Sequence, residues 1–338
     1  MIRLLFVFNQ VLTFVYVLLF GLSYLAPSTI PRLASVTLFT PVVIVLHVGF
    51  VCFWLVVRQK YLWYSLFTLL LLSGFTRSFW NISFGGSQLE LSSDQIIRIM
   101  TYNVKSFSSA SSKRGSFLDD FKKWKPLEDV NILFLQEAST RSFKGYPRKK
   151  LKFNRLQKNS VMPIGSSFSL RDYKVLIHDS LRLRHNAVVA DYNYNGRIIR
   201  CINLHAPSFR FKKDQKVTKN NYQKYIHRLN VNFVYQEQFV DRVTKAIKES
   251  PYPIILAGDF NNNAFSYLYR SIREAGLLQD AFLEKGEGFG ETFNFDYFPT
   301  RIDFVMVSQD FEVLSYVAYP KKEWSDHYPI VVDLVLKD

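Results

Sequence analysis

The run IILAGDFNNNAFS at residues 254–266 constrains this chain more than any other segment. Four apolar residues, Ile254 to Ala257, lead into Gly258, and Asp259 and Asn261 follow two positions apart. The pattern predicts a buried strand that ends at a glycine turn and delivers a carboxylate and a carboxamide there. Oxygen donors at such a place suit a divalent cation or a phosphate, provided that matching residues lie elsewhere in the chain.

Five further segments with strand patterns also carry a polar or ionisable residue, mostly where the strand ends. They are 97–104 with Asn103, 131–137 with Glu137, 200–205 with His205, 300–307 with Asp303, and 324–330 with Asp326 and His327. Chance would place such residues on helices and loops as well. Their concentration at strand ends therefore predicts one shared site.

The order and approximate spacing of these motifs resemble the endonuclease/exonuclease/phosphatase superfamily. That superfamily includes DNase I, the apurinic endonucleases, neutral sphingomyelinases and inositol polyphosphate phosphatases. The matching motifs are Asn103, Gln136-Glu137, His205, Gly258-Asp259-Phe260-Asn261, Arg301-Ile302-Asp303 and Ser325-Asp326-His327. The resemblance covers about residues 95–338. Because His205 stands in Asn-Leu-His, the chain is similar to the DNase I and sphingomyelinase branches and departs from the apurinic endonucleases, which have a tyrosine nearby.

Helical spacing of apolar residues predicts helices at 113–125, 232–249 and 265–275, between short strands. Strands that alternate with helices, mixed with hairpin-like strand pairs, predict two packed sheets with outer helices. The resemblance implies the same architecture, a four-layer α/β sandwich of two mixed sheets of the DNase I type. An N-terminal transmembrane segment is expected to precede it.

Phosphodiester hydrolysis requires a cation that neutralises phosphate oxygens, a base that activates water and a donor for the leaving oxygen. Glu137 is the best candidate metal ligand, because a carboxylate at the end of an apolar strand is costly unless it is paired or bound to a cation. Asn103 is expected to complete the oxygen set or to contact the phosphate, and Asp326 is a secondary ligand. The alternatives are a salt-bridged strand-end glutamate and a turn-capping asparagine.

His327 is the predicted general base, because it lies on a turn just before a strand. Asp303 would accept a hydrogen bond from its other ring nitrogen and raise its basicity, and the resemblance implies the same pair. Asp259 would orient the attacking water or bind a second ion, and Asn261 would contact the phosphate. His205 would donate to a phosphoryl oxygen or protonate the leaving group.

A set of ligands rich in oxygen and free of cysteine favours Mg²⁺, with Mn²⁺ or Ca²⁺ as alternatives, over a zinc thiolate site. Asn186, which precedes Ala187, resembles a superfamily position that contacts the substrate. His47 lies in an apolar run and His178 on an isolated turn, so neither is predicted to be catalytic.

The first 84 residues contain no Asp or Glu and only five basic residues. Because a bilayer core requires about 20 apolar residues in helical form, two or three transmembrane helices are expected. The predicted organisation is a membrane segment over 1–84 with helices at about 4–26, 36–57 and 61–80, a linker over 85–94 and a catalytic domain over 95–338. The alternatives are a cleaved signal peptide for the first run and a buried or interfacial helix for the third.

The basic residues of the membrane segment predict its orientation. Arg3 precedes the first run, Arg58 and Lys60 lie between the second and third, and Arg32 lies between the first and second. Placing the first three in the cytoplasm satisfies the positive-inside rule. With three spans the protein would be a multi-pass protein of a bacterial inner membrane with its catalytic domain in the periplasm, whereas two spans would leave the domain inside. Two cysteines give no disulfide framework and fit either side.

The formal net charge is +15, and the membrane segment carries five of these charges. An excess of this size favours anionic partners such as nucleic acid, phospholipid headgroups or inositol phosphates, although it also serves solubility. Two basic stretches, 141–158 and 210–224, contain interleaved aromatic residues. They suit a polyphosphate strand or an anionic membrane face, or else are solvated loops.

The sequence therefore predicts a membrane-anchored, Mg²⁺-dependent hydrolase of phosphoester or phosphodiester bonds. Its substrate would be a phosphate-containing anion, either nucleic acid or a phospholipid or inositol phosphate, and no protein partner is predictable. The alternative is a non-catalytic, membrane-tethered binding module that kept the fold. That alternative is disfavoured because every acid/base residue is present.

Overall fold

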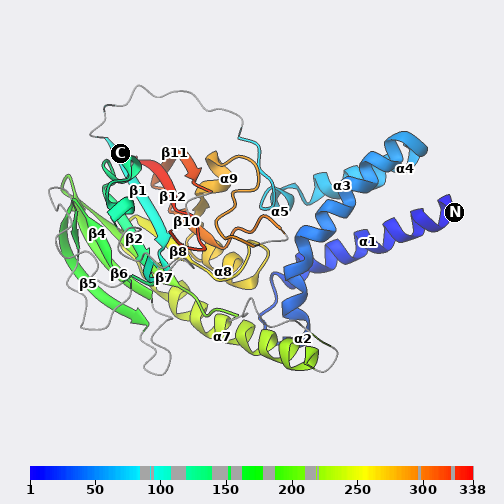
Figure 1. Ribbon diagram of the computed structural model, residues 1–338, viewed down its shortest axis with the longest axis horizontal. Coiled ribbons are helices and arrows are strands. Elements are labelled where there is room, and N and C mark those ends of the chain that lie inside the picture. The colour runs from blue at the N-terminus through cyan, green and yellow to red at the C-terminus, as the bar shows by residue number, and fades with distance from the viewer. Residues whose placement is uncertain are drawn as a thin grey trace. The chain divides into compact units, whose positions relative to one another are not determined.

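The computed structural model of the chain describes residues 1–83, 92, 95–107, 119–138, 151–153, 162–177, 187–209, 218, 221–295, 298–320 and 324–337. Two compact units are present (Figure 1). The helical unit comprises Met1–Trp80, Phe209–Glu237 and Asn263–Ser271. The sandwich unit comprises Asn81–Ser208, Gln238–Asn262 and Ile272–Asp338. Most of the predicted linker 85–94 lies outside the described residues.

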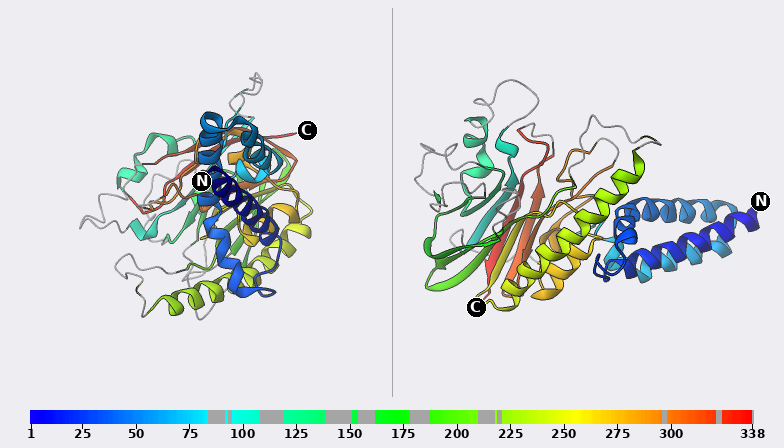
Figure 2. Two further views of the ribbon diagram at one scale, coloured as in Figure 1. Left: turned by 90° about the vertical axis from the view of Figure 1, so that its right-hand side faces the viewer. Right: turned by 90° about the horizontal axis from the view of Figure 1, so that it is seen from below.

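Two six-stranded mixed sheets build the sandwich unit (Figure 2). The first sheet contains, in spatial order, β11 (Phe311–Ala318), β12 (Ile330–Leu336), β1 (Ile96–Asn103), β2 (Ile132–Gln136), β4 (Ile164–Ser166) and β3 (Lys152–Phe153). The second contains β5 (Ser169–Ile177), β6 (Ala187–Tyr194), β7 (Arg197–His205), β8 (Ile254–Asp259), β10 (Asp303–Val307) and β9 (Gln279–Asp280). Parallel pairs β1–β2 and β7–β8 lie among antiparallel neighbours, which confirms the predicted mixed sheets.

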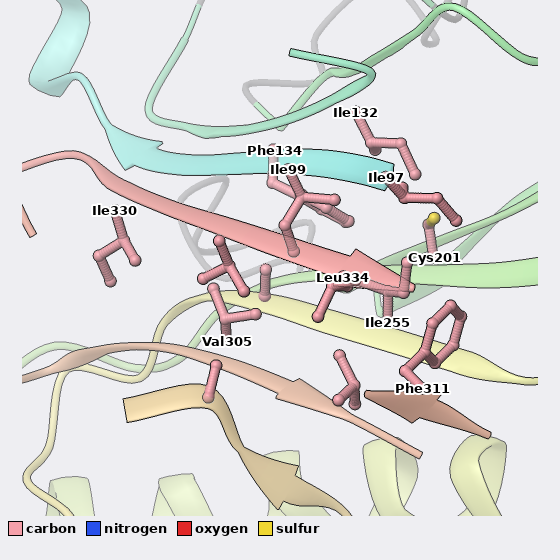
Figure 3. Packing of buried hydrophobic residues seen from close by; sticks show 14 of the residues in the cluster. Ile97, Ile99, Ile132, Phe134, Cys201, Ile255, Val305, Phe311, Ile330 and Leu334 are labelled. Carbon is pink, nitrogen blue, oxygen red and sulfur yellow. The ribbon is translucent and has the colours of Figure 1, made fainter. Parts of the chain in front are cut away.

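The main hydrophobic core lies between the two sheets (Figure 3). Ile99 of β1 and Phe134 of β2 point into it, as do Ile255 of β8 and Val305 of β10, and all four side chains are fully buried. Burial of one such side chain contributes about 1.5–3 kcal/mol. The apolar strand predicted before Gly258 is therefore a central strand of this core.

Strand β1 is buried on both of its faces. Ile97 and Ile99 enter the core between the sheets, whereas Met100 and Tyr102 join a second cluster with Phe121 and other residues of the segment that follows. Because alternate residues of a strand point to opposite faces, this division shows that the first sheet is covered on its outer side. The result agrees with the predicted four layers.

The helices outside the N-terminal region depart partly from the prediction. The long helix α7 (Tyr222–Lys248) begins ten residues before the predicted start at 232. Its first turns are rich in polar residues and expose Tyr222 and Ile226, so they lack the apolar spacing on which the prediction relied. Helices α8 (Tyr267–Ala275) and α9 (Ala281–Lys285) follow later in the chain. Of the predicted helix 113–125, residues 119–122 are helical and η3 (Lys125–Leu127) follows, while 113–118 lie outside the described residues.

The N-terminal residues of the helical unit form α1 (Ile2–Leu22), α2 (Pro31–Ala34), η1 (Ser35–Phe39), α3 (Thr40–Val57), α4 (Gln59–Leu71) and α5 (Ser73–Thr76). Two helical stretches, Ile2–Leu22 and Pro31–Val57, are long and apolar enough to cross a membrane. The predicted third span 61–80 is instead divided at Leu72 into α4 and α5. With 13 residues, α4 alone is shorter than the roughly 20 residues that a span requires.

These helices bury polar side chains and expose apolar ones. Asn9 is fully buried, and its Oδ1 accepts hydrogen bonds from Trp54 Nε1 at 3.0 Å and Ser65 Oγ at 2.8 Å. Phe14 and Val56 are 69% and 85% exposed. Apolar side chains such as Leu19 and Ile44 are buried between the helices as well, so the bundle has an apolar interior with polar groups in it and large apolar side chains on its surface.

Asn81, the first residue of the sandwich unit, is fully buried and fastened to α9 and the loop after it. Its side-chain Nδ2 donates to the carbonyl oxygens of Phe282, Leu283 and Gly286 at 2.8, 3.2 and 2.9 Å. Its backbone exchanges two hydrogen bonds of 2.9 Å with Gly288. One carboxamide thus reaches three carbonyl oxygens at the end of α9 and just after it, where a helix leaves its last carbonyls outside the helical ladder.

We expect Asn81→Ala to lower the free energy of unfolding by about 1–3 kcal/mol, because it removes three buried hydrogen bonds from the side chain to carbonyl oxygens of 282–286. Thermal unfolding of the full-length protein in detergent measures the loss. The neighbouring Ile82, which is 56% exposed, supplies the control: Ile82→Ala should leave stability unchanged. Equal stability of both variants would contradict the anchoring role of Asn81.

Candidate active site

Three ionisable residues form one row across the second sheet. Strand register places His205 opposite Asp259 and Asp259 opposite Asp303, on β7, β8 and β10 respectively. Gly258, with φ of 145°, brings β8 to this row. A Cβ at that position would lie 2.0 Å from the carbonyl oxygen of Leu204, so only glycine fits between the two strands.

The carboxylate of Asp259 lies at the centre of the site and is fully buried. Its Oδ2 accepts hydrogen bonds from Asn103 Nδ2 at 3.0 Å and Asn261 Nδ2 at 3.1 Å. The same oxygen lies 3.4 Å from His205 Nε2 and 3.7 Å from His327 Nε2. The first sheet thus contributes Asn103 and the second sheet Asp259, so the site joins the ends of both sheets.

His327 is held in one orientation by Asp303. The Nδ1 of His327 donates to Asp303 Oδ2 at 2.9 Å, which directs Nε2 toward Asp259. The Oγ1 of Thr292 accepts from the backbone N–H of Asp303 at 3.1 Å, and the ring of Phe293 lies 4.9 Å from the imidazole. The predicted hydrogen bond between His327 and Asp303 is therefore present and buried, and Thr292 and Phe293 contact its two members.

Burial and charge act in opposite directions on the two central groups. Burial raises the pKa of Asp259 to about 7, although His327 opposes the shift. Burial alone would lower the pKa of His327, but the carboxylates of Asp303, Asp259 and Asp326 outweigh it and raise that pKa to about 10. The protonated imidazolium is therefore favoured while these carboxylates have no other cation beside them.

Four residues other than glycine adopt positive φ angles where strands of the site end. They are Lys105, Ser106, Glu137 and Asn261, with φ of 42°, 55°, 51° and 50°. Such conformations are costly for residues with a side chain and cluster at functional sites. At Glu137 this turn places the carboxylate, which is 29% exposed, 3.8 Å from His205 Nε2.

Lys105 is a site residue that the sequence did not reveal. Its Nζ lies 2.5 Å from Asp326 Oδ2, and its backbone N–H donates to Asn103 Oδ1 at 3.0 Å. Burial would raise the pKa of Asp326, but His327 and Lys105 hold it below the ordinary value. Asp326, predicted as a secondary metal ligand, thus forms an ion pair here. The only sequence signal was the position of Lys105 two residues after a strand-end asparagine.

The donors at this site suit a hard divalent cation. Glu137, Asp259, Asp303 and Asp326 bring four carboxylates together, and Lys105 and the imidazoles only partly balance them. The Oδ1 of Asp303 is buried without a hydrogen-bond partner among the described residues. Ligand atoms of Asp259, Asp303 and His327 lie within 4.8 Å of one another. Asp303 and His327 already form a hydrogen bond with each other. The carboxylates of Glu137 and Asp259, which both lie beside His205 Nε2, are therefore the better candidates to bind an ion.

The structure brings together all but one of the predicted site residues. They are Asn103, Glu137, His205, Asp259, Asn261, Asp303, Asp326 and His327. Asn186 lies outside the described residues, as do most of the basic stretches 141–158 and 210–224. Thr292 and Phe293 were missed, because they lie on a loop whose sequence carries no ionisable motif of the predicted type.

The fold is an α/β sandwich of two mixed sheets, with buried carboxylates and histidines gathered at its strand ends. A family profile described as "Endonuclease/Exonuclease/phosphatase family" matches residues 100–327. The match spans more than half of the chain, and the chain belongs to this family. A second profile, a domain of unknown function, matches residues 2–79. No curated protein matches the chain.

Three solved structures with the same fold align with this chain over nearly their whole length. A family member from Bacteroides vulgatus has 18% identity, a TM-score of 0.54 and coverage of 72% of this chain and 99% of that one. A humanized D. rerio TDP2 has 15% identity, a TM-score of 0.52 and the same coverages. A mannosyl-6-phosphatase from Bacteroides thetaiotaomicron has 17% identity, a TM-score of 0.51 and coverages of 71% and 100%. At these identities the likeness establishes the fold.

We expect the cation-free protein to lose stability as the pH rises from about 6.5 to about 10. In that interval folded His327 keeps the proton that unfolded histidine releases, since its pKa is raised from 6.5 to about 10. Its contribution is complete below pH 6.5 and is lost by about pH 10. Unfolding midpoints of the full-length protein in EDTA across this range measure the slope.

His327→Gln should flatten that slope, because the titrating group is removed. His227→Gln removes an exposed histidine of α7 and should leave the slope unchanged. If the slope survives in His327→Gln, another group is responsible for it.

Proposed function

We propose that this protein hydrolyses phosphoester or phosphodiester bonds with His327 as the general base. The observation that supports this most is the buried hydrogen bond of 2.9 Å between His327 and Asp303. It leaves the second ring nitrogen of His327 directed toward Asp259, so that a water molecule beside Asp259 would lie within its reach. A histidine held by a carboxylate in this way has a fixed tautomer and a raised basicity.

The other site residues have distinct roles in this proposal. Asp259 orients the attacking water, and Asn103 and Asn261 fix its carboxylate through their amide groups. His205, with Nε2 between Glu137 and Asp259, donates to a phosphoryl oxygen or to the leaving oxygen. Lys105 holds Asp326 beside His327 and is a further candidate for contact with the phosphate.

A divalent cation, Mg²⁺ in the first instance and Mn²⁺ or Ca²⁺ as alternatives, would be held by Glu137 with Asp259. When bound, it would neutralise phosphate oxygens and offset the carboxylate charge that favours protonated His327. A non-catalytic binding module remains the second reading. The intact pair of His327 and Asp303 favours the enzyme, because binding a phosphate does not require a buried, oriented base.

His327→Ala should reduce the rate of hydrolysis by about 10²–10⁴-fold, the usual contribution of a general base. Full-length protein in detergent, assayed with Mg²⁺ and the soluble diester bis(p-nitrophenyl) phosphate, measures this change. EDTA should also abolish turnover in the unmodified protein.

The exposed histidine of α7 again provides the matched control, and His227→Ala should retain full activity. If His327→Ala hydrolyses the diester at the normal rate, the proposed mechanism is wrong. If the unmodified protein binds phosphate but never hydrolyses the diester, the binding-module reading replaces it.

We also propose that the N-terminal helices anchor the protein in a membrane. The exposed apolar faces of α1 and α3 and the buried hydrogen bonds of Asn9 support this, since lipid solvates apolar side chains and polar ones join helices inside the bundle. A core helix of a soluble protein would be mostly buried. In the most apolar 18-residue stretches of the two long helices, only 22% and 28% is buried. The buried hydrogen bonds of Asn9 with Trp54 and Ser65 favour a retained helix over a cleaved signal sequence.

Contacts within the bundle support a proposed orientation in the membrane. Phe6 stacks on Tyr61 at 4.2 Å, which places the start of α1 beside the turn between α3 and α4. Arg3, Arg58 and Lys60 therefore gather at one end of the bundle, the end proposed to face the cytoplasm. The run formed by α4 and α5 returns to the other end, where Tyr16 OH bonds Thr76 Oγ1 at 2.8 Å. In this proposal α4 and α5 together complete a third crossing, and the catalytic domain lies in the periplasm of a bacterial cell.

A reporter fused to the C-terminus tests this orientation. Alkaline phosphatase, which is active only outside the cytoplasm, should be active in this fusion. A cytoplasm-active reporter at the same position should be silent. The opposite pattern would show that the catalytic domain is cytoplasmic and that the chain crosses the membrane an even number of times.

A further inference from the structure

A groove lies on the surface of the helical unit between α1 and α4. Phe6 of α1 stacks on Tyr61 at 4.2 Å and meets Tyr64 edge to face at 5.6 Å, so α4 lies beside the start of α1 (Figure 1). The groove has a volume of about 580 Å³, and its lining comes from Phe6 and from α4 between Lys60 and Leu70. Apart from Lys60, every lining side chain is aromatic or aliphatic.

The apolar wall of this groove matches the depth of one leaflet of a bilayer. Trp63, Phe67 and Leu70 are four and three residues apart, so they share one face of α4. They are 67%, 65% and 62% exposed. The ten residues from Lys60 to Leu70 rise about 15 Å, which is half of the roughly 30 Å hydrocarbon core. One acyl chain of a lipid in that leaflet can therefore lie along the wall.

Three exposed cations surround the mouth of the groove. Lys60 lines it, and its ammonium lies 5.0 Å from the ring centre of Tyr61. Arg58 is in the turn two residues earlier, and Arg3 lies one helical turn before Phe6 on α1. Because residues 1–84 contain no Asp or Glu, this segment supplies no carboxylate that could neutralise them.

An apolar wall below a cationic mouth is complementary to an anion that carries a hydrocarbon chain. A zwitterionic lipid would cover the wall, but its headgroup brings no net charge to the cations. A soluble polyanion would meet the cations and leave the wall uncovered. A second copy of this chain, aligned in the same membrane, would bring the same cations to the same end, and like charges would oppose its docking. An anionic phospholipid satisfies both parts of the groove.

We propose that the groove between α1 and α4 is a binding site for an anionic phospholipid of the cytoplasmic leaflet. The phosphate of its headgroup pairs with Lys60 and the two arginines, and one acyl chain lies along Trp63, Phe67 and Leu70. Basic pockets beside membrane helices bind anionic headgroups in this way. The proposal rests on the proposed membrane anchorage and is independent of the hydrolytic function, because no residue of the active site takes part in it.

The experiment uses full-length protein reconstituted into phosphatidylcholine vesicles. Phosphatidylglycerol or phosphatidylcholine with brominated acyl chains replaces part of the lipid, because bromine quenches tryptophan fluorescence on contact. The difference in quenching between the unmodified protein and Trp63→Phe gives the contribution of Trp63. We expect phosphatidylglycerol to quench Trp63 half-maximally at a mole fraction about fivefold lower than phosphatidylcholine, or lower still, since one basic residue at a bilayer attracts anionic lipid by about that factor.

Charge variants test the headgroup contact. Lys60→Gln should lower the preference for phosphatidylglycerol by about fivefold, and Lys60→Arg should retain it. Arg32→Gln is the matched control, because it removes an exposed cation from α2, beyond the end of α1 that lies farthest from the groove. It should leave the preference unchanged. Equal unfolding midpoints in detergent without phosphatidylglycerol verify that the variants are folded.

Equal quenching of Trp63 by the two lipids overturns the proposal, because the wall then contacts ordinary bilayer lipid only. A preference that survives in Lys60→Gln also overturns it, since the cation at the mouth would not recognise the headgroup. Quenching of Trp63 by neither lipid means that another protein surface, such as a second copy of the chain, covers the wall. Release of the unmodified protein from the vesicles by alkaline carbonate would instead refute the membrane anchorage on which the proposal rests.

Discussion

The buried carboxylate of Asp259 is the group on which the rest of the structure depends. A charge removed from water is costly unless hydrogen bonds and opposite charges compensate it. Here Asn103 comes from one sheet, Asn261 from the following turn, and two histidines approach from either side. The two sheets must therefore pack in one register, with Gly258 allowing the close approach of β8 to β7. In this site burial raises the pKa of Asp259 to about 7, and the surrounding carboxylates raise the pKa of His327 to about 10.

The helical unit differs from the sandwich unit in that many of its large apolar side chains are exposed. Asn9 and Tyr16 form buried hydrogen bonds with Trp54 and Thr76 inside the bundle, and many apolar side chains, such as Phe14 and Val56, are exposed. In the sandwich unit, the carboxamide of Asn81 donates to carbonyl oxygens at the end of α9 and in the loop after it.

The fold was predictable to a large extent because its central strands are apolar and end at polar residues. Glu137 and His205 follow such strands, so a sequence pattern could place them at one edge of a sheet. Lys105 was not predictable, because its pairing with Asp326 depends on a left-handed turn and on a contact between distant segments. The early start of α7 was missed for a related reason: its first turns are polar, and apolar periodicity was the only signal used.

The sequence by itself determined which chemical groups the chain brings to its strand ends and that its first residues are apolar, since both follow from residue type and spacing. Only the tertiary structure decided how these groups act on each other. It placed His327 beside the carboxylates of Asp303, Asp259 and Asp326, which together raise the pKa of the histidine to about 10. It divided the third apolar run at Leu72 and fixed Asn81 beneath α9. Hydrogen bonds and burial are properties of residues far apart in the chain, and no local pattern encodes the distance between them.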